Sequence, residues 1–154
     1  MVGEEFAALP EQPASVADWE DLLVRLEIVP RVVRNAVEEV ENSASAVRVL
    51  ALAAAREVEV GRWLEAAARI GEPGACATDA PAADVAELAL RFASLRARTF
   101  AMLQRRGVDV WRWEGPLSEG GSATVNQLLL WLAGRDAVLL SELRRSARSG
   151  PAGC

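Results

Sequence analysis

The segment WLAGRDAVLLSEL, residues 131–143, places two opposite charges side by side in an otherwise apolar run. Its apolar residues recur at helical spacing, which predicts a helix with Arg135 and Asp136 interrupting the apolar stripe. A buried charge is costly unless it is paired, so these two side chains must reach solvent, find partners or form part of a site. We therefore take Arg135 and Asp136 as the first candidates for chemistry.

The amino-acid composition excludes several kinds of chemistry. The chain has no histidine, which excludes imidazole-based catalytic triads and histidine-ligated zinc. All its basic residues are arginine, so Schiff-base lysines and Walker-type phosphate loops are excluded as well. The two cysteines, Cys76 and Cys154, are too few and too far apart for a disulfide framework or a thiolate metal site, and we expect free thiols.

Length, charge and hydropathy favour a single folded domain and argue against nucleic-acid and membrane partners. The 154 residues, 51% hydrophobic and 25% charged, fit one folded domain. A net charge of −5 argues against a nucleic-acid partner, because such binding depends on clustered cations. No apolar run is long enough to cross a membrane, and the acidic N-terminus does not resemble a signal peptide. We expect a cytoplasmic protein with no membrane partner.

Four amphipathic segments predict an all-α fold. The predicted helices span about residues 15–41, 46–70, 84–106 and 122–143. Pro30 lies inside the first, where the unbroken apolar stripe favours a kink over two separate helices. We expect an up-down four-helix bundle, in which the connection between the second and third helices is long enough to form a crossover instead of a short turn. The domain would span residues 15–146, between a flexible leader (1–14) and a flexible tail (147–154).

Helix boundaries are indicated by capping residues, and one connection is unusually long. Ser15 and Asp84 are expected to begin helices, and either Ser122 or Thr124 to begin the last one. Residues 107–121 form a long predicted loop that carries two tryptophans, Trp111 and Trp113. We favour the interpretation that these rings cover the end of the core over the alternative that they form a ligand platform.

Three segments give the chain a resemblance to a known family. They are VRVLALAAAREVEVGRW, FASLRARTFAMLQRRGVDVWRW and TVNQLLLWLAGRDAVLLSELRR. With them the chain resembles the DinB-like superfamily of bacterial four-helix-bundle proteins, which includes thiol-dependent enzymes such as mycothiol-dependent maleylpyruvate isomerases. In members with a metal, one ligand is a histidine of the second helix and two are a His-x-x-x-His pair of the fourth. The corresponding positions here are Leu52, Arg135 and Leu139, so the resemblance implies a lost metal site and no cofactor.

Carboxylates could still form a different metal site, and Glu57, Glu59 and Asp136 are the nearest by helical position. Glu57 and Glu59 are two residues apart and face different directions on a helix, which makes a shared ion improbable.

The resemblance also implies a homodimer formed through bundle helices.

A non-metallic site remains possible on the same helices. Arg135 could hold a carboxylate or phosphate of a small anionic ligand by paired hydrogen bonds, and Arg56, Glu59, Asp136 and Trp131 could line the same site. The simpler alternative is that Arg135 pairs with Glu59 or reaches solvent, and that Arg56 pairs with Glu59 or Asp136.

Three hypotheses about function follow from these observations. The first is a non-catalytic or degenerate DinB-like bundle that binds a small ligand or a protein. The second is a thiol-dependent transferase or isomerase with a non-histidine site. The third is an interaction protein whose cavity is filled by Leu52, Leu139 and their neighbours.

Overall fold

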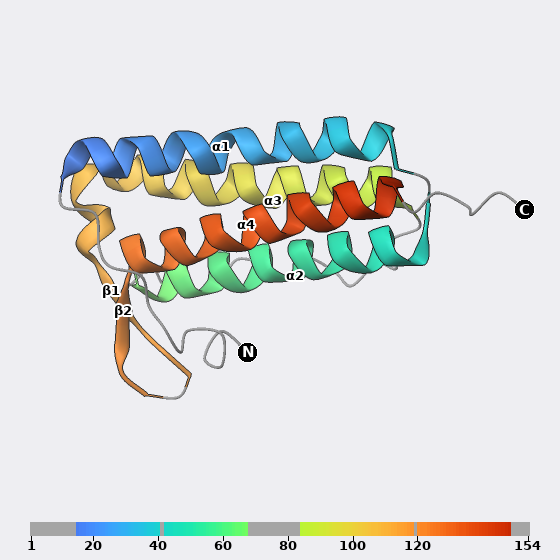
Figure 1. Ribbon diagram of the computed structural model, residues 1–154. Coiled ribbons are helices and arrows are strands. Elements are labelled where there is room, and N and C mark those ends of the chain that lie inside the picture. Colours follow the sequence, from blue (N-terminus) through green and yellow to red (C-terminus); the bar gives the residue numbers. More distant parts are fainter. Residues whose placement is uncertain (1–14, 41, 68–83, 119, 149–154) are drawn as a thin grey trace, which may run out of the picture.

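The computed structural model describes residues 15–40, 42–67, 84–118 and 120–148, and long helices account for most of them (Figure 1). The helices are α1 (Val16–Glu38), α2 (Ala44–Ala67), α3 (Val85–Arg106) and α4 (Val125–Arg148). Shorter elements join α3 to α4: a 3-10 helix, η2 (Val108–Arg112), and strands β1 (Glu114–Pro116) and β2 (Ser122–Thr124). The four predicted helices are confirmed, although α1 ends three residues earlier and α4 five residues later than predicted.

The helices do not simply alternate in direction. α1 and α4 run one way and α2 and α3 run the other, so α2 and α3 are parallel neighbours (Figure 1). α1 packs beside α3 and α4, and α2 packs beside the same two helices. The end of α2 and the start of α3 therefore lie at opposite ends of the bundle. The connection between them, residues 68–83, which we expected to be able to cross over, lies outside the described residues.

Each long helix begins at a side chain that accepts a hydrogen bond from a first-turn backbone N–H. The accepting residues are Ser15 for α1, Ser43 for α2, Asp84 for α3 and Thr124 for α4. At Thr124 the bond is reciprocal, because Gln127 Oε1 accepts from the Thr124 backbone N–H at 3.0 Å. These caps satisfy amide groups that a helix leaves without an internal partner, so they fix where the helices start.

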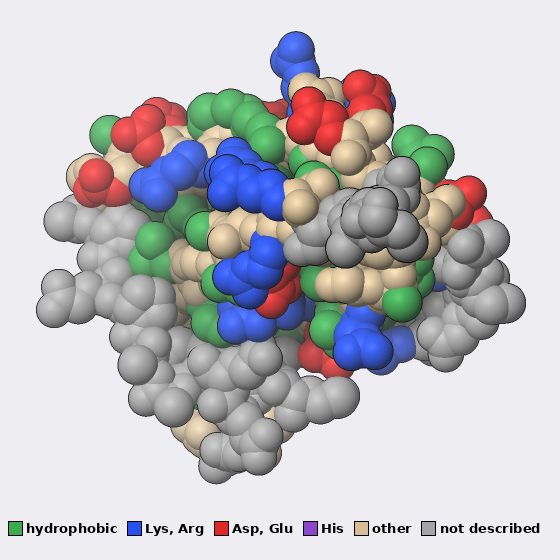
Figure 2. All heavy atoms as spheres, turned by 45° about the vertical axis from the view of Figure 1, so that its right-hand side comes forward, with side chains coloured by type: hydrophobic (Ala, Val, Ile, Leu, Met, Phe, Trp, Pro, Cys, Tyr) green, Lys and Arg blue, Asp and Glu red, His purple; other side chains and the backbone are tan. Residues whose placement is uncertain are grey.

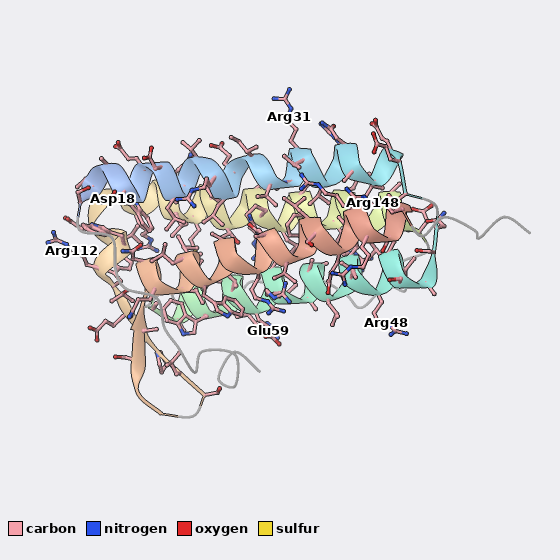
Figure 3. The ribbon with its side chains drawn as sticks, viewed as in Figure 1. Asp18, Arg31, Arg48, Glu59, Arg112 and Arg148 are labelled. Carbon is pink, nitrogen blue, oxygen red and sulfur yellow. The ribbon has the colours of Figure 1, made fainter. Side chains whose placement is uncertain are left out.

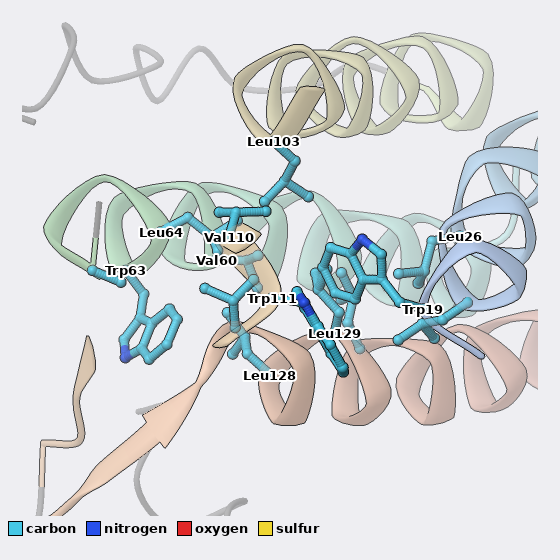
Figure 4. Close-up of a cluster of buried hydrophobic side chains, with 14 of the residues drawn as sticks. Trp19, Leu26, Val60, Trp63, Leu64, Leu103, Val110, Trp111, Leu128 and Leu129 are labelled. Carbon is cyan, nitrogen blue, oxygen red and sulfur yellow. The ribbon is translucent and has the colours of Figure 1, made fainter. Parts of the chain in front are cut away.

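The apolar core is divided into two clusters along the bundle. One cluster joins the first half of α1 and α4 to the last half of α2 and α3, and Trp19 and Trp111 meet in it with ring centroids 6.3 Å apart (Figure 4). The second cluster fills the opposite end of the bundle and includes Val33, Phe92 and Leu139. Between the two clusters, α2, α3 and α4 each place a charged residue in the interior. The apolar core is thus interrupted by a polar layer.

A small hairpin replaces most of the predicted loop between α3 and α4. Its strands have three residues each, which is too short to produce a recognisable alternating pattern in the sequence. The hairpin is joined to α2 by Trp63, whose Nε1 donates to the Pro116 carbonyl oxygen at 2.8 Å. Trp111 is buried in the first cluster, as the core-covering interpretation predicted, and Trp113 packs against that cluster.

The hairpin packs so closely on α2 that Gly115 of β1 has no room for a side chain. A Cβ at this position would lie 2.6 and 2.8 Å from ring atoms of Trp63 and 3.0 Å from the Cβ of Ala67. We expect Gly115→Ala to lower the free energy of unfolding by about 1–3 kcal/mol, because either the hairpin or the ring must shift. Urea denaturation followed by circular dichroism measures this change.

Gly134→Ala is the matched control, because a Cβ at Gly134 meets no atom within 4 Å and the residue is exposed inside α4. It should raise stability by about 0.5–1 kcal/mol, since glycine is a poor helix former. If Gly115→Ala and Gly134→Ala changed the free energy of unfolding by the same amount, the close packing of β1 on Trp63 would be contradicted.

Candidate functional site

The most unusual side chain in the bundle is Arg96 of α3, which is only 1% exposed. It stands in the buried stripe of this helix, four residues after Phe92 and four before Phe100. Its guanidinium carbon lies 5.0 Å from the centroid of the Phe92 ring, within the range of a cation–π contact. Arg96 was not among the residues predicted from the sequence, although a charged residue in an apolar stripe was a signal that could have found it.

Every N–H group of the Arg96 guanidinium has an acceptor. Glu57 of α2 accepts from Nε at 3.0 Å and from Nη2 at 2.7 Å. Asp136 of α4 accepts from Nη1 at 2.9 Å and from Nη2 at 2.8 Å. Nη1 also donates to the Leu26 carbonyl oxygen of α1 at 2.8 Å. One side chain thus connects all four helices, and its bonds to both carboxylates are bidentate. We call Arg96, Glu57 and Asp136 the buried charge cluster.

The acceptor on α1 is available because of a proline. A backbone carbonyl inside an α-helix normally accepts from the N–H four residues later, and the residue four after Leu26 is Pro30, which has no N–H. α1 continues without interruption through Pro30. The proline therefore leaves the Leu26 carbonyl without a helical partner, and Arg96 supplies the missing donor from α3.

Burial and pairing act against each other on the charges of the cluster. Burial raises the pKa of Glu57 more than its hydrogen bonds and charge attraction to Arg96 lower it. The pKa of Asp136 is likewise raised by burial, against the opposing effect of Arg96. Burial would lower the pKa of Arg96, but its hydrogen bonds to Glu57 and Asp136 outweigh this and raise it. Arg96 therefore stays charged, and the carboxyls are the groups whose protonation can change.

The structure separates the predicted ligand-binding residues into an interior and an outer set. Asp136 is buried and bound by Arg96, a pairing that was not predicted from the sequence. Arg56, Glu59, Trp131 and Arg135 are half-buried. The Arg56 guanidinium carbon lies 5.9 Å from the Trp131 ring centroid, which brings a residue of α2 against one of α4. Whether these residues bind a ligand stays a prediction.

The positions aligned with metal ligands in the DinB-like superfamily do not share one environment. Leu52 is 59% exposed on α2, whereas Leu139 is 4% exposed and belongs to the second apolar cluster. Arg135 is half-buried on α4. A side chain as exposed as Leu52 cannot fill an enclosed cavity together with Leu139, which weakens the hypothesis of a cavity plugged by both leucines.

The donors available for a metal ion are few in the described part of the chain. It contains no group of three or more histidine, cysteine, aspartate or glutamate side chains placed to hold an ion. In the buried charge cluster, each oxygen of Glu57 and Asp136 accepts a hydrogen bond from Arg96. A guanidinium repels a divalent cation, so this cluster fits a structural clamp better than a metal centre.

Surface charge is unevenly distributed among the helices. α4 is basic: besides the buried Asp136 it has one acidic residue, Glu142, and four arginines, Arg135, Arg144, Arg145 and Arg148. α1 is acidic, with Asp18, Glu20, Asp21, Glu27 and Glu38 against Arg25, Arg31 and Arg34. Arginine side chains gather across the middle of the face in Figure 2, with carboxylates beside them. Arg31 projects away from the bundle on α1, and Arg48 and Glu59 project from α2 on the side away from α1 (Figure 3).

Comparisons with known proteins add no relative to this description. No protein-family model, curated protein or solved structure matches the chain. Membership of the DinB-like superfamily therefore stays a prediction from the residues. Within the described part of the chain, none of the helices combines the length and the hydrophobicity that crossing a bilayer requires.

Removing the central guanidinium tests the buried charge cluster. Arg96→Met would leave Glu57 and Asp136 buried without their cation, and we expect a loss of about 3–5 kcal/mol of unfolding free energy. The control is Arg98→Met on the same helix, because Arg98 is 59% exposed and its ion pair with Glu65 spans 3.6 Å. That change should cost less than about 1 kcal/mol in denaturant titrations.

A second variant separates pairing from packing. Replacing all three members of the cluster by methionine or leucine removes the buried charges together and should recover most of the stability lost in Arg96→Met. If the triple variant is no more stable than Arg96→Met, the loss comes from packing rather than from unpaired charge.

Proposed function

We propose that this chain is a non-catalytic binding protein, built on a DinB-like bundle, that takes a small anionic ligand on the face shared by α2 and α4. The ligand would carry a carboxylate or phosphate group, and Arg56 and Arg135 would hold it by paired hydrogen bonds. Trp131 would provide the apolar surface beside them. The buried charge cluster would support this face from within.

The placement of Arg56 carries the proposal. Its guanidinium stands over Trp131 at 5.9 Å, so a cation of α2 reaches across to α4 at the rim of the bundle. Arg135 is four residues after Trp131 and therefore lies one turn further along the same side of α4. One half-buried arginine thus lies over the Trp131 ring, and a second half-buried arginine follows one turn later on the same side of α4. This arrangement suits an anion with a planar or apolar part.

The buried charge cluster supports a binding role over a catalytic one. All five N–H groups of Arg96 are engaged, and the cluster is shielded from solvent by the surrounding helices. A catalytic acid or base must reach its substrate within hydrogen-bond distance, which a group this deep and fully bonded does not do. Glu57 of α2 and Asp136 of α4 are thus engaged in holding the helices together.

Ligand binding can be tested with inorganic phosphate and benzoate as probes, using isothermal titration calorimetry and the thermal unfolding midpoint. We expect each of Arg56→Leu and Arg135→Leu to weaken binding by about tenfold or more, since a hydrogen bond to a charged group is lost. Arg48→Leu is the control, because Arg48 is exposed on α2 outside the proposed site. Sodium chloride at matched ionic strength separates site binding from screening.

Two results would contradict this proposal. Equal weakening by all three arginine variants would indicate general charge attraction, and no difference from chloride would indicate no anion site. Stoichiometric zinc, nickel or manganese in the purified protein, removed with loss of a thiol-dependent activity, would favour the alternative of a transferase or isomerase.

We also propose that the chain forms a homodimer through the face of α1 and α4. These two helices are parallel neighbours, so a two-fold axis that runs parallel to them, between the two copies, sets the acidic α1 of one copy against the basic α4 of the other. Val24 and Ile28 are 54% and 50% exposed and, being four residues apart, share one side of α1. Charge complementarity and this exposed pair support a second copy as the occupant.

Sedimentation analysis over a range of concentrations tests the dimer. Ile28→Asp should shift the protein toward monomer, because it replaces an apolar contact by a charge that must lose water when the two copies pack. Leu90→Asp is the control, since Leu90 is 60% exposed on α3, away from the proposed interface. A monomer at all concentrations, or equal effects of both substitutions, would contradict the proposal.

A further inference from the structure

The charges of the buried cluster do not balance. One guanidinium faces two carboxylates, so the fully ionised cluster carries one surplus negative charge in the interior. Both carboxylates are shielded, with Glu57 2% and Asp136 4% exposed. An uncompensated charge at such depth is expensive, and a buried acid relieves this cost by taking up a proton.

The groups facing the two carboxyls show what else could balance this charge. From α3 comes Arg96, whose donors are all engaged, and from α1 comes the Leu26 carbonyl, which adds partial negative charge. From α2, Arg56 attracts both carboxylates, but it is half-buried at the rim and its charge is partly screened by solvent. α4 contributes Asp136 itself. No second buried cation faces the cluster from the described residues.

We propose that the buried charge cluster is a proton-binding site that holds one proton, shared between Glu57 and Asp136. This proton makes the stability of the folded bundle sensitive to pH. With the proton in place, one carboxylate and one carboxylic acid share Arg96 and the cluster is neutral. Without it, α2 and α4 bring two like charges to the same guanidinium. This inference is independent of the anion site proposed above.

The sign of the pH effect follows from where the proton is bound. Burial raises the pKa of both carboxyls in the folded chain, so the folded state keeps a proton that the unfolded state has released. Between the ordinary pKa of the unfolded carboxyls and the raised value, folding takes up a proton, and stability decreases as pH rises. A protein held by exposed or well-balanced salt bridges responds in the opposite direction, since its carboxylate pKa values are lowered.

Denaturant titrations of the full chain between about pH 8 and about pH 5 test the proposal. We expect the unfolding midpoint of the wild type to rise as the pH is lowered through this range. Glu57→Gln and Asp136→Asn each remove the surplus carboxyl, so either variant should lose most of this dependence even if it is less stable overall. Glu59→Gln, which changes a half-buried carboxyl of α2 outside the cluster, should retain the dependence.

Infrared spectroscopy provides a direct readout that does not depend on stability. The folded wild type at neutral pH should show the carbonyl stretch of a protonated, buried carboxylic acid, and the band should disappear in both Glu57→Gln and Asp136→Asn. Absence of this band in the wild type would overturn the proposal. A midpoint that falls with decreasing pH, or a dependence that is unchanged in both cluster variants, would overturn it as well.

Discussion

The need to satisfy one buried guanidinium constrains the whole bundle. Arg96 has five N–H groups in a rigid plane, and each must find an acceptor because an unpaired buried donor is costly. Its acceptors come from three other helices, so Leu26, Glu57 and Asp136 must lie at one level and face inward together. Since one residue along a helix turns the side chain by about 100°, a shift of any helix by one residue breaks the cluster. The polar layer therefore selects one arrangement of the four helices.

The apolar clusters and the polar layer contribute differently to the fold. Apolar packing on both sides of the layer provides the general driving force for folding and tolerates small shifts between helices. The charge cluster adds directional bonds that do not tolerate such shifts. Occupying Glu57 and Asp136 in the interior also leaves Arg56 and Arg135 at the rim between α2 and α4. The proposed binding function therefore lies on the outer face of a layer that is itself structural.

Local signals predicted local structure well, and signals that act between helices were missed. Ser15 and Asp84 begin helices as predicted, because a cap is formed within one turn of the chain. Of the two residues expected to be able to begin the last helix, Ser122 and Thr124, Thr124 forms the cap. The short hairpin was not predicted, since its strands depend on packing against Trp63 rather than on any alternating pattern. Leu52, assigned to a ligand position by resemblance, proved to be exposed. The length of the segment between α2 and α3 left a crossover open as an alternative to strict alternation, and the structure places these two helices as parallel neighbours.

The sequence by itself determined which chemistry is absent and which segments are helical. A chain without histidine or lysine excludes whole classes of mechanism, and apolar spacing with capping residues is sufficient to predict four helices. Only the tertiary structure decided that Asp136 pairs with Arg96, a residue 40 positions away, together with Glu57. The pairing of charges between helices depends on how each helix is rotated and at what level it lies. That information emerges only when the helices pack, so neighbours in the sequence such as Arg135 and Asp136 could not reveal it.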